Sequence, residues 1–517
     1  MSDAVFIGIK TVLKAFAFWW RLFCLELYYI YRINGNMAKR DIQIIINFFF
    51  VFGFVAVAYG QQSTIQVEKN RIDSLRGDFR IFRNRFQNDY PSLYRYSSKI
   101  KMNALFDSCY TSIRSSTTDI DFYKMLKILL SDIKDGHLYC SSPPYFQSHY
   151  QEKANFFPLQ LRFINHRAYL LNSYKNKIPA GTEILSINNQ PIDFIRQKLF
   201  LYLTSDGNIE TKKYQILNNF FYFYYYLEFG EQAIFNVNFK SESRKINTIK
   251  INADLEKNII KNEDKVEPEK LLELSIKPNN IAIITIKTFE SSKLKKDFPS
   301  FLQTSFKELN NRKIKRLIID LRGNAGGKDT YGSLLYSYLT NKPFHYYQSL
   351  ETATTLLPYE QFKSDVSSYN NLNIGMIEKI SEKRFRLKKE AHPNLQLIKP
   401  ARYYFAGKIC FLIDGLSFST TTEFCSIAYS NKRGKFIGEE TGGTYVGNTS
   451  GVDVETILPS TKINLSYGTV KYSMAVKQEK YKGRGVIPNY KVRPTINNII
   501  NHQDVVLDYA LKLIVQK

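Results

Sequence analysis

The carboxyl-terminal half of the sequence alternates between strand-like and helix-like segments. Short apolar runs such as "NIAIITIKTF" and "KICFLID" predict buried strands, and the longer segments between them have the amphipathic periodicity of helices. Consecutive strands joined through helices pair in parallel, because a parallel pair needs a long crossover connection. From residue 279 onward the sequence therefore predicts an α/β core with a parallel sheet.

Two segments of this half have an unusual composition, and each directly follows a predicted strand. "DLRGNAGGKD" has three glycines in one strand-to-helix turn, and "DGLSFSTTTEF" has five hydroxyl side chains within the six positions 417–422. In a parallel sheet, sites form at the carboxyl ends of the strands. We therefore expect the two segments to open onto one site.

The hydroxyl-rich segment has two interpretations. Ser and Thr side chains at a helix start often act only as caps, and Thr420 with Glu423 fits a capping box. Alternatively, a serine on the turn between a strand and a helix presents its hydroxyl over the strand end, as a nucleophile does.

The glycine-rich turn predicts a backbone that can approach and bind an anion. A phosphate loop is excluded, because Lys328 is followed by Asp329 instead of Ser or Thr. An oxyanion hole needs only N–H donors, and the turn satisfies that requirement.

Six segments, in their order and spacing, resemble the tail-specific (C-terminal processing) serine peptidase family over roughly residues 65–515. They are "DGH", "GTEILSINNQPI", "LIIDLRGNAGG", "SFSTTTEF", "GEETGG" and "GVIPNY". The resemblance implies a ClpP/crotonase-like α/β core with an N-terminal helical segment and an inserted PDZ-like domain. It further implies hydrolysis of peptide bonds in a peptide or protein substrate, with no metal and no other cofactor.

The resemblance assigns roles to individual residues. The serine that closes "[ST]-x-S" is Ser419, and Thr420 is the alternative, because many members place the nucleophile three residues before the Glu. The family's usual lysine is absent from "GEETGGTYVGN", so the base falls to His137 of "DGH", as in tricorn-type and retinoid-binding-protein-like members. The N–H groups of Gly326 or Gly327, with that of Thr420, would hold the oxyanion.

The group that orients His137 is left open by the sequence. Asp135 is close to it in sequence and is set aside, and Glu479 is a candidate near the carboxyl terminus. An incomplete site would leave a catalytically silent relative that binds peptides or lipids. A crotonase-like acyl transferase with the same oxyanion hole is a third interpretation.

The amino terminus predicts export. From Met37 a basic start, an apolar run and the small residues of "AYG" before Gln61 form the layout of a signal peptide, and a membrane anchor is the alternative because the run is close to spanning length. We expect a periplasmic or cell-envelope location. The expected division of the chain is an extension at 1–36, the signal at 37–60, a helical region at 61–150, the PDZ-like domain at 151–255 and the peptidase core at 270–517.

The formal charge of +25 permits contact with anionic surfaces. The basic residues are spread along the chain without a nucleic-acid-binding motif, so no nucleic-acid partner is expected. The cysteines have no metal-ligand spacing, so no metal site is expected either. Neither composition nor motifs indicate an oligomeric state.

Overall fold

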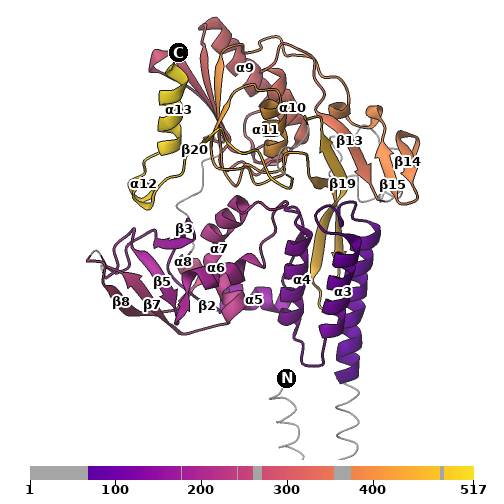
Figure 1. Cartoon of the computed structure of the whole chain (residues 1–517), viewed down its shortest axis with the longest axis vertical. Coiled ribbons are helices and arrows are strands. Elements are labelled where there is room, and N and C mark those ends of the chain that lie inside the picture. The colour runs from indigo at the N-terminus through magenta and orange to yellow at the C-terminus, as the bar shows by residue number, and fades with distance from the viewer. Residues whose placement is uncertain are drawn as a thin grey trace, which may run out of the picture. The chain divides into compact units, whose positions relative to one another are not determined.

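The computed structural model describes residues 68–175, 177–241, 243–259, 270–353, 374–477 and 482–516 (Figure 1). The chain divides into two units, one of Met1–Asp78 with Tyr110–Thr118 and one of Phe79–Cys109 with Asp119–Lys517. The predicted signal segment and Glu479 lie outside the described residues. Within the described ranges, no helix combines the length and apolar character needed to span a bilayer.

A six-stranded sheet forms the core of the carboxyl-terminal half. Its strands, in spatial order, are β10 (Leu272–Lys277), β11 (Ile281–Ile286), β12 (Arg316–Asp320), β16 (Lys408–Ile413), β17 (Lys435–Gly438) and β20 (Tyr490–Lys491). The β10–β11 pair is antiparallel and every other pair is parallel. The predicted α/β core is confirmed.

Helices cover both faces of this sheet, which explains why its strands are apolar without interruption. One face packs against α9 (Phe298–Asn311), α10 (Asp329–Ser337) and α11 (Thr420–Ser430), and the other against α13 (Val505–Val515) (Figure 1). Alternate strand residues divide between the two layers: Ile319 joins the cluster with α11, whereas Ile318 joins the cluster with α13.

A second sheet connects the helical region to the core. It contains β1 (Tyr139–Cys140), β19 (Asn464–Met474), β13 (Tyr347–Thr352), β15 (Arg384–Leu387) and β14 (Ile377–Ser381) in this order, with β18 (Thr449–Ile457) paired to β19. Strand β1 directly follows the "DGH" motif and pairs antiparallel with β19. This pairing fixes the motif against the carboxyl-terminal half of the chain.

The "DGH" motif follows α4 (Asp119–Ile133), a helix within the helical region expected at 61–150. Its buried side chains repeat at helical spacing and include Phe122, Leu126, Leu129, Leu130 and Ile133. The helix ends at Ile133, and Lys134 takes a left-handed conformation with φ of 64°. Gly136 lies within the turn that follows.

A third, antiparallel sheet lies within residues 151–255, where a PDZ-like domain is expected. It consists of β3 (Leu161–Ile164), β4 (Arg167–Leu170), β5 (Glu183–Ile187), β7 (Ile234–Lys240) and β8 (Ile246–Asn252), with β6 (Gln190–Pro191) on β5. Helices α6 (Ile192–Phe200) and α7 (Thr211–Phe229) pack on it. The aromatic run at 218–230 lies largely in α7, and Phe221, Tyr222 and Tyr225 are buried, so the run contributes to the core.

Further described elements include α3 (Lys99–Ser112), α5 (Pro144–Glu152), β2 (Asn155–Phe156) paired with β9 (Asp254–Leu255), α8 (Glu256–Ile259) and α12 (Ile496–Ile500). The predicted domain boundaries, and the PDZ-like nature of the third sheet, stay predictions.

Candidate active site

His137 and Ser419, 282 positions apart in sequence, meet in the structure. The Nε2 atom of His137 lies 3.1 Å from the Oγ atom of Ser419. His137 stands on the turn after α4, and Ser419 is the N-cap residue of α11, just past the carboxyl end of β16. This is the distance required for an imidazole that accepts a serine proton.

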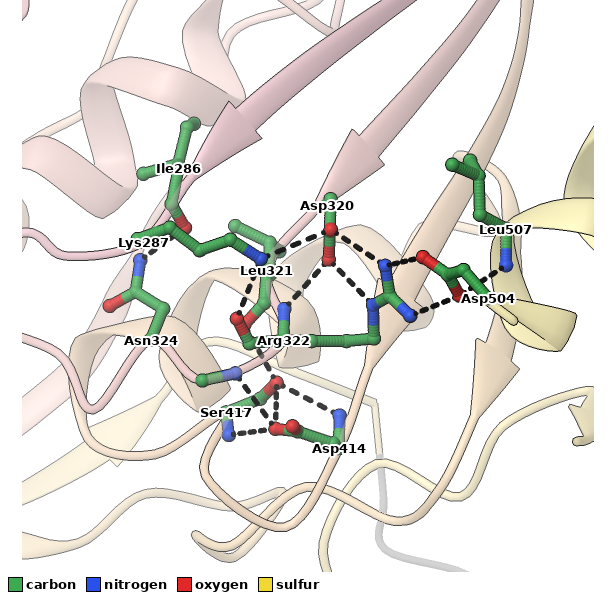
Figure 2. A network of polar contacts seen from close by, with 11 residues as sticks. Ile286, Lys287, Asp320, Leu321, Arg322, Asn324, Asp414, Ser417, Asp504 and Leu507 are labelled. Carbon is green, nitrogen blue, oxygen red and sulfur yellow. Dashed lines mark hydrogen bonds and ion pairs between the residues drawn. The ribbon is translucent and has the colours of Figure 1, made fainter. Parts of the chain in front are cut away.

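The backbone at Ser419 has an unusual conformation, with φ of 54° and ψ of −129°. A residue with a Cβ atom in such a region is destabilised by about 1–3 kcal/mol, so surrounding contacts must hold it. Asp414 supplies part of that support, because one of its carboxylate oxygens accepts the N–H groups of Gly323 and Ser417 at 3.1 and 3.0 Å. The hydroxyl of Ser417 donates to the carbonyl of Leu321 at 3.0 Å. The strand ends are thereby joined below the site (Figure 2).

Figure 2 also shows how the start of the glycine-rich turn is anchored. The Arg322 guanidinium lies between two carboxylates, at 2.8 Å from Asp320 and 2.7 Å from Asp504, and Lys287 Nζ is 3.1 Å from Asp320. Burial alone would raise the pKa of Asp320, but the hydrogen bonds from Arg322 and the two cationic charges outweigh burial and lower it. Asp320 is therefore a structural anion that holds the turn to the sheet.

The glycines of this turn are required by close packing. Gly326 and Gly327 have φ of 105° and 135°, which L side chains rarely adopt. A Cβ atom on Gly326 would lie 2.7 Å from the Cβ atom of Ser419, and one on Gly327 would lie 2.2 Å from the backbone of Phe289. The turn therefore packs directly against the segment that carries the serine.

The three N–H groups assigned to an oxyanion hole differ in their bonding. The Gly326 N–H donates to Oδ1 of Asn324 at 3.0 Å, inside the turn itself. Among the described residues, the N–H groups of Gly327 and Thr420 have no hydrogen-bond partner. The Thr420 hydroxyl donates to the Gly327 carbonyl at 2.7 Å and links the two donors. The geometry thus favours Gly327 over Gly326.

Most of the neighbouring hydroxyls bond to the backbone. Ser417 and Thr420 donate to main-chain carbonyls as described, and Thr422 donates to the Ser417 carbonyl at 2.7 Å. Ser419 is the member of the group that faces the imidazole.

The predicted capping box at the start of α11 is wrong. Thr420 is the first helical residue instead of the cap, and the Glu423 side chain binds Tyr347 and Asn448, each at 2.8 Å. Glu423 is turned into a buried polar cluster, away from the helix start.

Asp135 lies beside the second nitrogen of His137. Its Oδ1 atom accepts the backbone N–H of His137 at 2.8 Å and lies 3.5 Å from the ring atom Nδ1. Its Oδ2 atom accepts the Tyr90 hydroxyl at 2.6 Å. The sequence analysis set Asp135 aside because it lies only two residues before His137. In the structure a tight turn places its carboxylate beside the imidazole ring. The 3.5 Å between Oδ1 and Nδ1 is short enough for an ion pair but too long for a good hydrogen bond. Nδ1 has no hydrogen-bond partner in the described part of the chain.

The charge on Asp135 suits this position. Burial would raise the pKa of its carboxyl, yet the contacts with His137 and the Tyr90 hydroxyl outweigh burial and lower it. Asp135 therefore presents an anion to the imidazole.

Lys212 is a neighbour of the site that the sequence analysis missed. Its Nζ atom donates to the Gly136 carbonyl at 2.6 Å and lies 3.7 Å from the centroid of the Phe418 ring, which packs on the His137 ring at 4.4 Å between centroids. Burial lowers the pKa of Lys212 to about 8, against the opposing effect of nearby carboxylates. Lys212 forms no hydrogen bond to Ser419, so it braces the "DGH" turn.

Asp206 also supports the "DGH" turn, from the loop that precedes α7, the helix that contains Lys212. Its carboxylate accepts the Gly136 N–H at 2.6 Å and the Thr444 N–H at 3.2 Å. Burial, and then the charge of Asp135, raise its pKa. No local pattern marks Asp206 or Lys212, since each lies 70 or more positions from the motif it contacts.

Asp135, His137 and Asp206 place ligand-type atoms within 4.8 Å of one another, a spacing that could hold a metal ion. The carboxylates, however, already accept N–H and O–H bonds, and the Lys212 ammonium lies beside them. The two carboxylates are therefore satisfied by the protein itself, and we assign no metal to this group.

A serine on a strand-to-helix turn, with an imidazole at its hydroxyl and open N–H groups beside it, defines a serine hydrolase type of site. Residues 280–492 match the model described as Peptidase family S41, which makes this core a serine-type peptidase domain. The matched segment contains Ser419 and the glycine-rich turn, whereas His137 precedes it. No curated protein matches the sequence.

Solved structures of CPAF share the fold. The crystal structure of mature CPAF has a TM-score of 0.57 at 13% identity, over 86% of this chain and 96% of that one. Mature CPAF complexed with lactacystin has a TM-score of 0.56 at 12% identity, over 86% and 98%. The photosystem II D1 C-terminal processing protease has a TM-score of 0.38 at 13% identity, over 83% and 97%. The CPAF similarity supports the peptidase-type α/β architecture.

Proposed function

We propose that this protein is an exported serine peptidase in which Ser419 is the nucleophile and His137 the general base. The 3.1 Å contact between Nε2 and Oγ carries the proposal. The proposed site belongs with the "DGH" branch, because its base comes from the turn after α4 and no lysine of the described residues forms a hydrogen bond to the serine.

The reaction follows from the positions of these groups. Ser419 Oγ attacks the carbonyl carbon of the scissile peptide bond while His137 Nε2 accepts the hydroxyl proton. The oxyanion receives hydrogen bonds from the N–H groups of Gly327 and Thr420. The imidazolium then protonates the leaving amine, and water repeats the sequence to release the acyl product. The Asp135 carboxylate, 3.5 Å from Nδ1, stabilises the imidazolium during these steps.

Labelling with a fluorophosphonate tests this function. We expect one equivalent of label on intact protein, located on Ser419 by peptide mass spectrometry, because the oxyanion donors and the base activate this hydroxyl alone. The Ser419→Ala variant serves as the control and takes up no label. Protein that is folded, takes no label and cleaves no peptide would instead support the silent peptide- or lipid-binding relative.

Export is proposed from the segment that begins at Met37. We expect the mature chain to start near Gln61, because small residues precede it at the positions a signal peptidase requires. N-terminal sequencing of protein isolated from its own host measures the start. A mature chain that retains residues 37–60 would contradict cleavage and indicate membrane association through an anchor.

A further inference from the structure

A chain of buried polar side chains lies behind the nucleophile and takes no part in the proposed chemistry. The Tyr347 hydroxyl on β13 lies 2.8 Å from Oε2 of Glu423 and 3.1 Å from Oδ2 of Asp329. His392 Nε2 lies 3.0 Å from the same Asp329 oxygen. Glu423, Tyr347 and His392 are all at most 3% exposed. Two carboxyl groups therefore share one buried phenol, and of the two Glu423 is buried whereas the Asp329 side chain is 13% exposed.

Counting protons shows that one of these carboxyls is neutral. A tyrosine hydroxyl has one hydrogen, and an ionised carboxylate can only accept. If Tyr347 donates to one carboxylate, the other must carry a proton and donate to the phenol oxygen. Two ionised carboxylates on one hydroxyl would leave a buried contact between like partial charges without a proton.

The neighbours decide which carboxyl holds the proton. His392 Nδ1 accepts the Asn394 N–H at 3.1 Å, so in the neutral ring the proton is on Nε2, which faces Asp329. Asp329 is therefore the ionised member. Glu423 is the neutral acid, with its proton toward Tyr347.

The surroundings of Glu423 agree with this assignment. Burial and, next, the charge of Asp329 raise the pKa of Glu423 to about 7, against the opposing effects of the hydrogen bonds with Asn448 and Tyr347 and of the His137 charge. The Tyr346 phenol also faces this cluster. No cation among these groups pairs directly with Glu423.

The series of side chains Glu423, Tyr347 and Asp329 links the starts of the two helices that form the proposed site. Asp329 begins α10 two residues after Gly327, and Glu423 lies in the first turn of α11, four residues after Ser419. The helices touch here, since a Cβ atom on Gly332 would lie 3.1 Å from Thr420 Cγ2. A change in the distance between Glu423 and Asp329 therefore changes the position of the nucleophile relative to the oxyanion donor.

We propose that Glu423 is a positioning residue that acts as a neutral acid, and that the Glu423–Tyr347–Asp329 link holds Ser419 in register with the glycine-rich turn. The inference rests on the proposed function. Ionisation of Glu423 places a second carboxylate anion beside the shared Tyr347 hydroxyl. The repulsion between the two carboxylates then pushes the start of α11 away from the start of α10.

The test compares two substitutions of Glu423 by peptide hydrolysis across pH. We expect wild-type kcat to fall as pH rises above about 7, where Glu423 ionises. Glu423→Gln stays within about twofold of wild type below that pH and lacks the alkaline fall, because its amide is neutral at every pH and can donate to Tyr347. Glu423→Ala loses about tenfold or more in kcat with KM within about twofold, because the link is gone.

Glu351→Gln is the matched control. Glu351 is a buried carboxylate on the same strand as Tyr347, but Arg384 and Lys471 pair with it. Burial opposes these contacts, yet they lower its pKa, so it is ionised throughout the measured range. We expect Glu351→Gln to keep the alkaline fall. A Glu423→Gln variant as weak as Glu423→Ala would overturn the proposal, as would a wild-type profile without an alkaline fall.

Thermal unfolding provides a readout that does not depend on activity. A folded-state pKa raised from the ordinary 4.5 to about 7 means that the folded protein binds more protons, so this group's contribution to stability falls as pH rises through that window. The Tm of wild type should therefore decline relative to Glu423→Gln between these pH values. An unchanged difference refutes the neutral acid, and failed labelling of Ser419 separately refutes the peptidase function.

Discussion

Replacing Ser419 with alanine abolishes peptide turnover and leaves the protein folded. The hydroxyl supplies the attacking oxygen, and removal of one member of a serine–base pair lowers kcat by about 10⁴–10⁶. Alanine keeps the Cβ atom that the backbone at φ of 54° already accommodates, so the free energy of unfolding changes little. Steady-state kinetics on a peptide substrate, with circular dichroism melting of the same samples, measures both effects.

Thr420→Ala is the control for this experiment, because it removes the neighbouring hydroxyl. It loses the 2.7 Å bond to the Gly327 carbonyl, worth about 1 kcal/mol of stability, and keeps the backbone N–H that faces the oxyanion. We expect turnover to fall far less than in Ser419→Ala. If Ser419→Ala retains activity and Thr420→Ala does not, the nucleophile is Thr420.

His137→Ala lowers kcat nearly as far as Ser419→Ala does, and the double substitution is no worse than either alone. The two side chains act as one unit, because the hydroxyl is a weak nucleophile until Nε2 at 3.1 Å accepts its proton. Kinetics of the two single variants and the double variant measure this non-additivity.

Two further variants make that result specific. His149→Ala removes an exposed histidine that pairs with Glu231 and should leave kcat unchanged. Lys212→Met removes the buried cation beside the "DGH" turn and should lower kcat less than His137→Ala does, because Lys212 Nζ bonds to the Gly136 carbonyl and not to the serine. An active His137→Ala with an inactive Lys212→Met would identify the lysine as the base.

The elements of the core could be predicted because their signals are local. Apolar runs and amphipathic periods located β11, β12, β16 and α11 within a few residues. Strand-to-helix turns rich in glycine or in hydroxyls are equally local, and parallel pairing brings such turns to one edge of the sheet. The aromatic run at 218–230 shows the limit of such signals. It lies in α7, but burial on several sides of that helix removes the one-sided apolar period by which a helix is predicted.

The sequence by itself determined the α/β core, the two segments that meet at its strand ends, and the choice of Ser419 and His137 as a pair. Tertiary structure alone decided what surrounds them. Lys212 and Asp206 bind the "DGH" turn from a helix and a loop that are distant in sequence. The Gly326 N–H donates to Asn324, whereas the Gly327 N–H makes no such bond. The proton that we assign to Glu423 depends on contacts with Tyr347 and Asp329, which stand on other elements. Such contacts depend on how separate elements pack in space, and spacing along the chain contains no record of which buried atoms face one another.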